Sequence, residues 1–381
     1  MTKVLYIFGT RPEAIKMAPL ILRMKRSTSF EVKVCVTGQH RTMLDQVLKF
    51  FNINPDYDLS LMKTNQTLSG ITSDSIKGIS RILSSQYDPD LIIVQGDTTT
   101  ALAGALSGFY FKKKIVHIEA GLRSHNKYSP FPEEMNRVLI TKLADLHFAP
   151  TRQAYDNLLR EGVEPHSVFN VGNTVIDALF LGLKTLRTTD QADIRNKFPF
   201  LSNGARAILV TGHRRENFGA PFENICYALK EIVEKNEAVH IIYPVHLNPH
   251  VMEPVKRILG NSERIHLTEP LDYPYLIWLL NRSYLIVTDS GGIQEEAPAL
   301  GKPVIVMRDV TERMEGVAAG TSVLVGTNRE KIFSKCQQLL TDQSEYQRMA
   351  KSVNPYGDGN SCRRITAILQ TKYRTKDVVQ I

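Results

Sequence analysis

Three acidic residues of this chain lie where charged side chains contribute little to packing and are well placed for chemistry. Asp97 and Glu119 each come at the end of a short apolar run, and Glu133 follows on a proline-rich loop. Proton transfer within one site needs carboxyl groups of different pKa, so we interpret the three as candidate acid–base residues. The structural alternatives are a helix N-cap for Asp97 and a solvent-exposed position for Glu133.

A glycine-containing segment in the second half of the chain, Ser290-Gly291-Gly292, has the pattern of an anion site. It follows an apolar run and precedes a segment with helical character. Backbone N–H groups at a helix N-terminus attract anions, and glycines let a phosphate approach closely. The alternative is an ordinary turn in which Ser290 or Asp289 caps the helix. The sequence contains neither G-x-G-x-x-G nor G-x-x-x-x-G-K-[ST], which disfavours a Rossmann dinucleotide enzyme and a P-loop NTPase.

Several cations have positions that suit the same anion. Arg11 and Lys16 flank the first turn of the first predicted helix. A cation at this positive end of a helix is unfavourable unless an anion binds there. Together with Arg313 and His213 from the second half, these residues would form a clamp around a diphosphate.

The elements that position these residues follow from the apolar pattern. Short runs of Val, Ile and Leu alternate with segments of helical period such as Ala14–Met24 and Thr99–Phe111. Continuous apolar strands between helices predict parallel sheets covered on both faces, and polar residues at strand ends then gather at the carboxyl edge, where such sheets bind ligands. The predicted strands are Val4–Phe8, Val32–Val36, Leu91–Val94, Ile115–Ile118, Leu146–Phe148, Val168–Val171, Ile208–Val210, His240–Tyr243, Ile265–Leu267, Tyr284–Val287, Val304–Met307 and Val323–Val325.

These strands form two sets, which predicts an α/β protein of two Rossmann-like, doubly wound domains. We place the first domain at residues 1–172, with a C-terminal helix at 361–381 returning to it. The second domain occupies residues 173–360. A chain of 381 residues is long enough for two domains of ordinary size.

Composition narrows the classes of function. The formal net charge of +8 is spread along the chain, which fits either a basic surface or an anionic small substrate, and lacks the clustering typical of nucleic-acid binding. No apolar run approaches the ~20 residues of a membrane span. The four cysteines lack disulfide or metal-ligand spacing, so we expect free thiols in a reducing cytoplasm. The sequence has no H-E-x-x-H or equivalent motif, so we expect no catalytic metal, and we expect no other cofactor.

Five motifs, in order and at matching spacing from residue 3 to about residue 365, resemble the non-hydrolysing UDP-N-acetylglucosamine 2-epimerases. The motifs are Gly9-Thr10-Arg11-Pro12-Glu13-Ala14-Ile15-Lys16, Gly96-Asp97-Thr98-Thr99-Thr100, His117-Ile118-Glu119-Ala120-Gly121-Leu122-Arg123, Thr211-Gly212-His213-Arg214-Arg215-Glu216-Asn217 and Thr288-Asp289-Ser290-Gly291-Gly292-Ile293-Gln294-Glu295-Glu296. The resemblance implies a GT-B-like pair of domains with the active site in the interdomain cleft, a homodimer, and interconversion of UDP-GlcNAc and UDP-ManNAc for bacterial surface polysaccharide synthesis.

The resemblance also implies roles for individual residues, each by its position in a motif. Those implied to be essential to catalysis are Asp97, Glu119, Glu133 and His213. Those implied to bind the substrate are Arg11, Lys16, His213, Arg313, Ser290, Gly291 and Gly292 at the diphosphate, Glu296 at the ribose hydroxyls, and Leu271 and Leu276 within a uracil pocket around Pro270–Leu276. Some family members have an aromatic residue where this chain has Leu276, so Tyr273 or Tyr275 would substitute in stacking on the base.

The residue types fit an elimination. The C2 proton of an N-acetylhexosamine is not acidic, so simple deprotonation is implausible. If UDP leaves C1 first, positive charge develops on the sugar and a carboxylate can take the C2 proton, which yields 2-acetamidoglucal and UDP. Reprotonation on the other face and return of UDP give the epimer. Cations stabilise the departing diphosphate, and a closed site retains the glucal.

Some branches of the family also carry an allosteric UDP-GlcNAc site. The matching residues here are Gln39, His40, Gln66, Arg214 and His246. This chain departs from that branch at Thr42, which replaces a glutamine, and at Asn65, which replaces an arginine. Loss of the arginine removes a bidentate anion contact, so we expect substrate activation to be weak or absent.

Four alternatives remain open at this point. An epimerase of a UDP-diacetamido-uronic acid would resemble Gly-Ala-Arg-Pro-Gln at its N-terminus, where this chain has Thr10 and Glu13. A hydrolysing epimerase would release free ManNAc and UDP. A glycosyltransferase of the same fold would need an acceptor groove, which no motif marks. A non-catalytic nucleotide-sugar binder would not need three acids beside a diphosphate.

Overall fold

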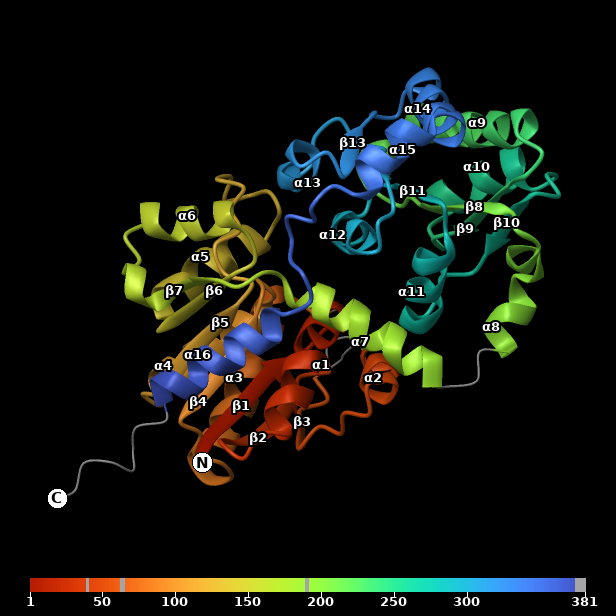
Figure 1. Ribbon diagram of the computed structural model, residues 1–381. Helices are drawn as coiled ribbons and strands as arrows, with labels where there is room; N and C mark the ends of the chain where they lie inside the picture. Colours follow the sequence, from red (N-terminus) through yellow and green to blue (C-terminus); the bar gives the residue numbers. More distant parts are fainter. Residues whose placement is uncertain (39–40, 62–65, 189–191, 374–381) are drawn as a thin grey trace. The chain divides into compact units, whose positions relative to one another are not determined.

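The computed structural model describes residues 1–38, 41–61, 66–188 and 192–373, and the chain divides into two compact units (Figure 1). Unit 1 comprises Met1–Leu181 and Tyr356–Ile381, and unit 2 comprises Gly182–Pro355. The first division falls inside helix α7 (Thr174–Thr188), nine residues beyond the boundary that the sequence suggested after Gly172 (181 − 172). The sequence boundary was placed where the run of predicted strands ends, but helix α7 begins just after that point and belongs partly to each unit.

Unit 1 is a parallel sheet with helices along both faces. Its elements are β1 (Thr2–Phe8), α1 (Arg11–Lys25), β2 (Phe30–Val36), α2 (Arg41–Phe50), β3 (Tyr57–Asp58), α3 (Leu68–Ser85), β4 (Leu91–Gln95), α4 (Thr99–Tyr110), β5 (Lys114–Ile118), α5 (Glu133–Leu143), β6 (Leu146–Ala149), α6 (Arg152–Arg160), η1 (Pro165–Ser167), β7 (Val168–Asn170) and α16 (Ser361–Tyr373). The strand order is β3-β2-β1-β4-β5-β6-β7, and the C-terminal helix α16 packs beside α1.

Unit 2 repeats the plan. Its elements are α8 (Ala192–Lys197), η2 (Pro199–Asn203), β8 (Arg206–Thr211), η3 (Arg215–Asn217), α9 (Ala220–Lys235), β9 (Val239–Pro244), α10 (Pro249–Leu259), β10 (Ile265–Thr268), α11 (Tyr273–Arg282), β11 (Leu285–Thr288), α12 (Gly291–Ala299), β12 (Val304–Val306), α13 (Met314–Ala318), β13 (Ser322–Leu324), α14 (Arg329–Thr341) and α15 (Gln343–Ala350). The strand order is β10-β9-β8-β11-β12-β13, which is the doubly wound order 3-2-1-4-5-6.

Strand order determines where each unit can bind a ligand. In unit 1 the order reverses direction between β1 and β4, and in unit 2 it reverses between β8 and β11. Doubly wound sheets bind ligands beyond the carboxyl ends of the strands at such a switch point. The segments that leave these four strands begin at Gly9, Gly96, Gly212 and Asp289, so each falls within one of the polar motifs.

Glycines bring helix α4 close to the unit 1 sheet. A Cβ atom at Gly104 would lie 3.0 Å from a side-chain carbon of Val94, and one at Gly108 would lie 2.9 Å from a side-chain carbon of Ile92. The helix therefore packs tightly on β4, and its first turn is fixed beside the end of that strand. This packing positions the segment that contains Asp97.

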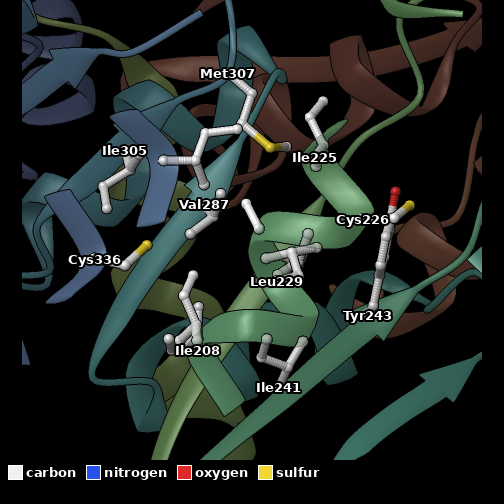
Figure 2. Close-up of a cluster of buried hydrophobic side chains, with 14 of the residues drawn as sticks. Ile208, Ile225, Cys226, Leu229, Ile241, Tyr243, Val287, Ile305, Met307 and Cys336 are labelled. Atoms are coloured by element: carbon white, nitrogen blue, oxygen red, sulfur yellow. The ribbon is translucent and has the colours of Figure 1, made fainter. Parts of the chain in front are cut away.

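The unit 2 core is a layer of aliphatic side chains between α9 and the sheet. Figure 2 shows Ile225, Cys226 and Leu229 of α9 together with Ile208 and Ile241 of the strands, all of them fully buried. Burial of such side chains stabilises a fold by roughly 1.5–3 kcal/mol each. The core fixes β8 and β11 side by side and thereby the two segments that follow them.

The predicted strands are confirmed, and the two α/β domains with parallel sheets match the expected fold class. One strand escaped prediction, the two-residue β3, because Tyr57–Asp58 is too short to produce an alternating or continuous apolar pattern. Among the described residues, no helix is long and apolar enough to cross a membrane.

Candidate functional site

Helix α5 holds Asp97 at the end of β4. The Arg137 guanidinium donates to Asp97 Oδ2 at 2.6 Å, and the Asn136 side-chain amide donates to the Asp97 carbonyl at 2.8 Å. Asp97 is not the N-cap of α4, because Thr98 takes that role by accepting the N–H of Ala101. The structural alternative for Asp97 is therefore wrong, and its carboxyl group lies at the ligand-binding edge of the sheet.

The environment of Asp97 favours its protonated form. Burial raises the pKa of Asp97 above its ordinary value, and the neighbouring carboxylates of Glu119 and Glu133 raise it further, while Arg137 and Lys16 lower it. The other two predicted acids thus act electrostatically on Asp97. A carboxyl group of raised pKa can accept and return a proton near neutral pH more readily than an exposed one.

Glu119 is a buried carboxylate surrounded by donors. Lys16 Nζ lies 2.6 Å from both carboxylate oxygens, the Gln95 amide donates to Oε2, and the Asn173 amide lies 3.4 Å from Oε1. The Glu119 side chain is only 5% exposed. Its backbone adopts φ 62°, a left-handed conformation that non-glycine residues rarely take and that clusters at functional sites.

Glu133 and Glu134 have different positions at the start of α5. Glu133 is half-buried in the first turn. Glu134 is buried, accepts the backbone N–H groups of Ser124 and His125 at 3.0 Å each, and lies 3.3 Å from Arg137. Glu134 therefore shapes the loop that follows Glu119 and pairs with Arg137 on the same helix.

The start of α1 combines a structural acid with a cation. Glu13 Oε2 accepts the backbone N–H groups of Gly9 and Thr10, and Oε1 accepts the Thr98 hydroxyl at 2.7 Å, so Glu13 ties the ends of β1 and β4 together. Burial raises the pKa of Glu13 while these hydrogen bonds lower it. In the described part of the chain Arg11 forms no side-chain ion pair or hydrogen bond, which leaves its charge at the positive end of α1 available to an anion.

In unit 2, Arg313 lies against the N-terminus of α12. Its Nε atom donates to Glu295 Oε1 at 2.9 Å, and its Cζ atom lies 3.3 Å from the position that a Cβ at Gly291 would occupy. Ser290 is the N-cap residue and its side chain makes no capping bond. The cation and the helix N-terminus thus face the same space, as the predicted diphosphate clamp requires.

The predicted nucleoside-binding residues lie on α11 and α12. Glu296 is buried in α12, and the Tyr273 hydroxyl lies 3.5 Å from its Oε1 atom. Leu271 lies just before α11 and Leu276 lies in its first turn, and both side chains are half-buried. Tyr273 is 4% exposed and belongs to the core, so Tyr275 is the more accessible of the two aromatic candidates.

His213 lines a pocket of about 450 Å³ in unit 2 with Arg214 and His246. The rings of His213 and His246 stack with centroids 5.6 Å apart. Burial lowers the pKa of His246, and the neighbouring His213 lowers it further, while Asp289 raises it.

The residues predicted for an allosteric site are only partly described. Arg214 and His246 lie in unit 2, where they line the pocket beside His213. Gln66 lies in unit 1, where its amide donates to the carbonyl of Leu61. Gln39, His40 and Asn65 lie outside the described residues, as does the side chain of Thr42.

Four residues around the candidate acids and His213 were not identified as functional from the sequence. Gln95, Asn136 and Arg137 contact Asp97 or Glu119, and Asp289, considered only as an N-cap, instead contacts His213. Arg137 carried a signal, because it follows the Glu133-Glu134 pair by one helical turn. Within the described residues, no group of three or more His, Cys, Asp or Glu side chains is placed to hold a metal ion.

Comparison with known proteins places this geometry in context. A family model described as UDP-N-acetylglucosamine 2-epimerase matches residues 22–370. The chain is 53% identical to the UDP-N-acetylglucosamine 2-epimerase of Salmonella typhimurium over 371 residues, covering 97% of this chain and 98% of the relative, and 52% identical to that of Escherichia coli K12 over 370 residues, with the same coverage.

Solved structures agree with the sequence comparison. UDP-GlcNAc 2-epimerase from Neisseria meningitidis, bound to UDP-GlcNAc, aligns with a TM-score of 0.89 at 47% identity, over 97% of this chain and 100% of that one. The enzyme from Methanocaldococcus jannaschii, in complex with UDP-GlcNAc and UDP, aligns with a TM-score of 0.78 at 35% identity, over 97% of this chain and 100% of that one. Both contain the two-domain fold described above.

Proposed function

The chain belongs to the UDP-N-acetylglucosamine 2-epimerase family, and we propose that it interconverts UDP-GlcNAc and UDP-ManNAc without releasing the sugar. The observation that carries this proposal is a group of three acids, in which Glu119 and Glu133 act electrostatically on Asp97 beside the switch point of a doubly wound sheet. Proton removal and return on opposite faces of one carbon need more than one such group.

In the proposed reaction, unit 2 binds the UDP part of the substrate and unit 1 supplies the acid–base groups. The bond between C1 and the diphosphate oxygen breaks, the electron pair leaves with UDP, and a carboxylate takes the C2 proton to give 2-acetamidoglucal. A second acid returns a proton to the other face, and UDP adds back to C1. The α12 N-terminus and Arg313 stabilise the negative charge that develops on the diphosphate. Arg11 and Lys16 add further positive charge for the same purpose.

Three further parts of the proposal rest on the family resemblance. We propose a homodimer and a role in supplying UDP-ManNAc for bacterial surface polysaccharides. The four cysteines are buried free thiols, which fits the reducing cytoplasm in which we place the enzyme.

Incubation of the purified protein with UDP-GlcNAc alone, followed by ¹H and ³¹P NMR, tests the proposed activity. We expect a stable mixture of UDP-GlcNAc and UDP-ManNAc. Free ManNAc with UDP would show a hydrolysing epimerase instead. If UDP-GlcNAc stays unchanged but a UDP-diacetamido-uronic acid is turned over, the enzyme is an epimerase of that uronic acid.

Replacing Gly292 with alanine should weaken binding of UDP without harming the fold. Within the described part of the chain, a Cβ at Gly292 meets no atom within 4 Å, and its φ is not positive, so the methyl group projects into the space where a phosphate would approach. We expect the Kd for UDP to rise at least about tenfold, which is about 1.4 kcal/mol. Isothermal titration calorimetry measures this change.

Thermal unfolding supplies the control for Gly292→Ala. Alanine in the first turn of α12 restricts the unfolded chain more than glycine, so stability should be equal or slightly higher. Unchanged UDP affinity in this stable variant would mean that phosphate does not approach Gly292.

Replacing Arg137 with glutamine should move the acid limb of the pH–rate profile to higher pH. Arg137 lowers the pKa of Asp97 against the effect of burial, so loss of its charge lets that pKa rise further. If ionised Asp97 accepts the proton, a higher pH is then needed to reach full activity. The measurement is kcat/KM against pH for the variant and the wild type.

Arg152→Gln is the matched control for Arg137→Gln. Arg152 lies on α6, its side chain is 76% exposed, and it pairs with Asp156 on the same helix. Its profile should coincide with that of the wild type. An acid limb that stays in place in Arg137→Gln would show that Asp97 does not govern the limb.

A further inference from the structure

Asp289 is a fully buried carboxyl group with one oxygen that lacks a hydrogen-bond donor. Its Oδ2 atom accepts the backbone N–H groups of His213 at 2.8 Å and Arg214 at 2.9 Å. Its Oδ1 atom is buried without a hydrogen-bond partner in the described part of the chain. A buried carboxylate oxygen without a donor is costly, so its orientation calls for a physical reason.

The His213 side chain lies beside the unsatisfied oxygen. His213 Nδ1 lies 3.4 Å from Asp289 Oδ1, within ion-pair range and slightly beyond an ordinary N–H···O bond. Such contacts are often long in ligand-free enzymes and shorten when substrate binds. Because the other carboxylate oxygen already holds the His213 backbone, rotation of the imidazole alone can close the remaining gap.

The sheet fixes this arrangement. Asp289 directly follows β11, and His213 is the second residue after β8. Thr288 pairs in register with Thr211 in these adjacent strands. The Arg214 Nε atom donates to the Asp289 carbonyl at 3.0 Å, which ties the two segments together a second time. The His213 ring also stacks with the His246 ring, with centroids 5.6 Å apart.

We propose that Asp289 is a positioning residue that holds the Nδ1–H of His213 and thereby turns Nε2 toward the pocket. This inference rests on the proposed function and on the role at the substrate diphosphate that the family resemblance implies for His213. The hydrogen bond made by one ring nitrogen determines which nitrogen carries the proton of the neutral ring. With Nδ1–H held by Asp289, any further proton that the ring takes up or releases is on Nε2, which lies on the side away from Asp289.

Asparagine at position 289 reverses the hydrogen bond while keeping the shape of the side chain. Its carbonyl oxygen can still accept the backbone N–H groups of His213 and Arg214, so its NH₂ group faces His213 Nδ1. Nδ1 must then accept, and the proton of the neutral ring moves to Nε2. The variant therefore separates the tautomer of His213 from the packing of the loop.

¹⁵N NMR of protein with labelled histidine, at a pH where the ring is neutral, tests the proposal directly. His213→Gln assigns the resonances. We expect the proton on Nδ1 in the wild type and on Nε2 in Asp289→Asn. Asn217→Ala removes a contact of 3.4 Å to Oδ2, the carboxylate oxygen that does not face the His213 ring, and should leave the tautomer unchanged. A wild-type ring protonated on Nε2, which needs no variant to detect, would overturn the proposal.

Kinetics give a second readout. The kcat of Asp289→Asn should fall about 10²-fold, since correctly placed proton donors and acceptors contribute at least this much, with a smaller change in KM. An unchanged kcat in the folded variant would also overturn the proposal. If the wild type does not turn over UDP-GlcNAc, the proposed function fails while the NMR experiment still decides the Asp289 contact. If it does and the tautomer is the same in both proteins, the Asp289 inference alone fails.

Discussion

Asp97→Asn is expected to lose turnover by about 10²–10⁴-fold, the contribution of a positioned acid–base group, and at the same time to unfold at a higher temperature near neutral pH. Burial raises the pKa of Asp97, which means that the fold disfavours its charged form. Asparagine removes that charge and can still accept a hydrogen bond from Arg137. Arg137 also keeps Glu134 as a partner at 3.3 Å.

The gain in stability should depend on pH with a definite sign. The folded-state pKa of Asp97 is raised, so its carboxyl group costs no stability below the unfolded-state pKa, and the cost appears as pH rises through the folded-state pKa. Wild type and variant should therefore unfold at similar temperatures in acid and diverge toward neutral pH. Scanning calorimetry across this range is the measurement.

Asp156→Asn is the control for Asp97→Asn. Asp156 lies on α6 in an exposed pair with Arg152, so its replacement should leave both activity and unfolding temperature nearly unchanged. If Asp97→Asn keeps wild-type turnover, Asp97 is not an acid–base group. If it is less stable at neutral pH, the ion pair with Arg137 outweighs the cost of burial.

Lys16→Gln is expected to lose both activity and about 3–5 kcal/mol of stability, because it leaves Glu119 buried without its cation. Glu119→Gln should also lose activity. The double variant, which carries both Lys16→Gln and Glu119→Gln, should recover most of the stability that the single variants lose. It should recover none of the lost activity. Urea unfolding of the four proteins, with NMR assays of turnover, measures this cycle.

The double variant decides between two roles for the contact of Lys16 with Glu119. Recovery of stability without activity means that the charges are kept for catalysis rather than for folding. Additive losses of stability would mean that the two residues do not depend on each other, and would contradict the pairing at 2.6 Å. Activity in the double variant would remove both residues from the proposed reaction.

The fold could be predicted from the sequence because its signals are local. Strands of a parallel sheet are buried on both faces and therefore appear in the sequence as continuous apolar runs, such as Val4–Phe8 and Leu91–Val94. Asp97 could be proposed because it belongs to a short polar segment after an apolar run, whereas Arg313 gained weight only from the other cations and from the family resemblance. Strand order, in contrast, depends on packing between residues far apart in the chain.

The residues that the sequence did not reveal make contacts between neighbouring strands, and those contacts depend on the strand order. Gln95 is the last residue of β4, directly after an apolar run, and it contacts Glu119 only because β4 and β5 are neighbours. Asp289 and His213 are 76 positions apart and meet because β8 and β11 pair. The left-handed backbone of Glu119 also has no sequence signal, since glutamate has no preference for that conformation.

The central claim is that side chains of this protein remove and return the C2 proton, and reaction in D₂O tests it most directly. UDP-GlcNAc is incubated with the purified protein, and the C2 position of both UDP-sugars is followed by NMR. We predict UDP-ManNAc with deuterium at C2, followed by deuterium in the UDP-GlcNAc pool as the reaction reverses. UDP-ManNAc that retains the original proton at C2 would contradict the account.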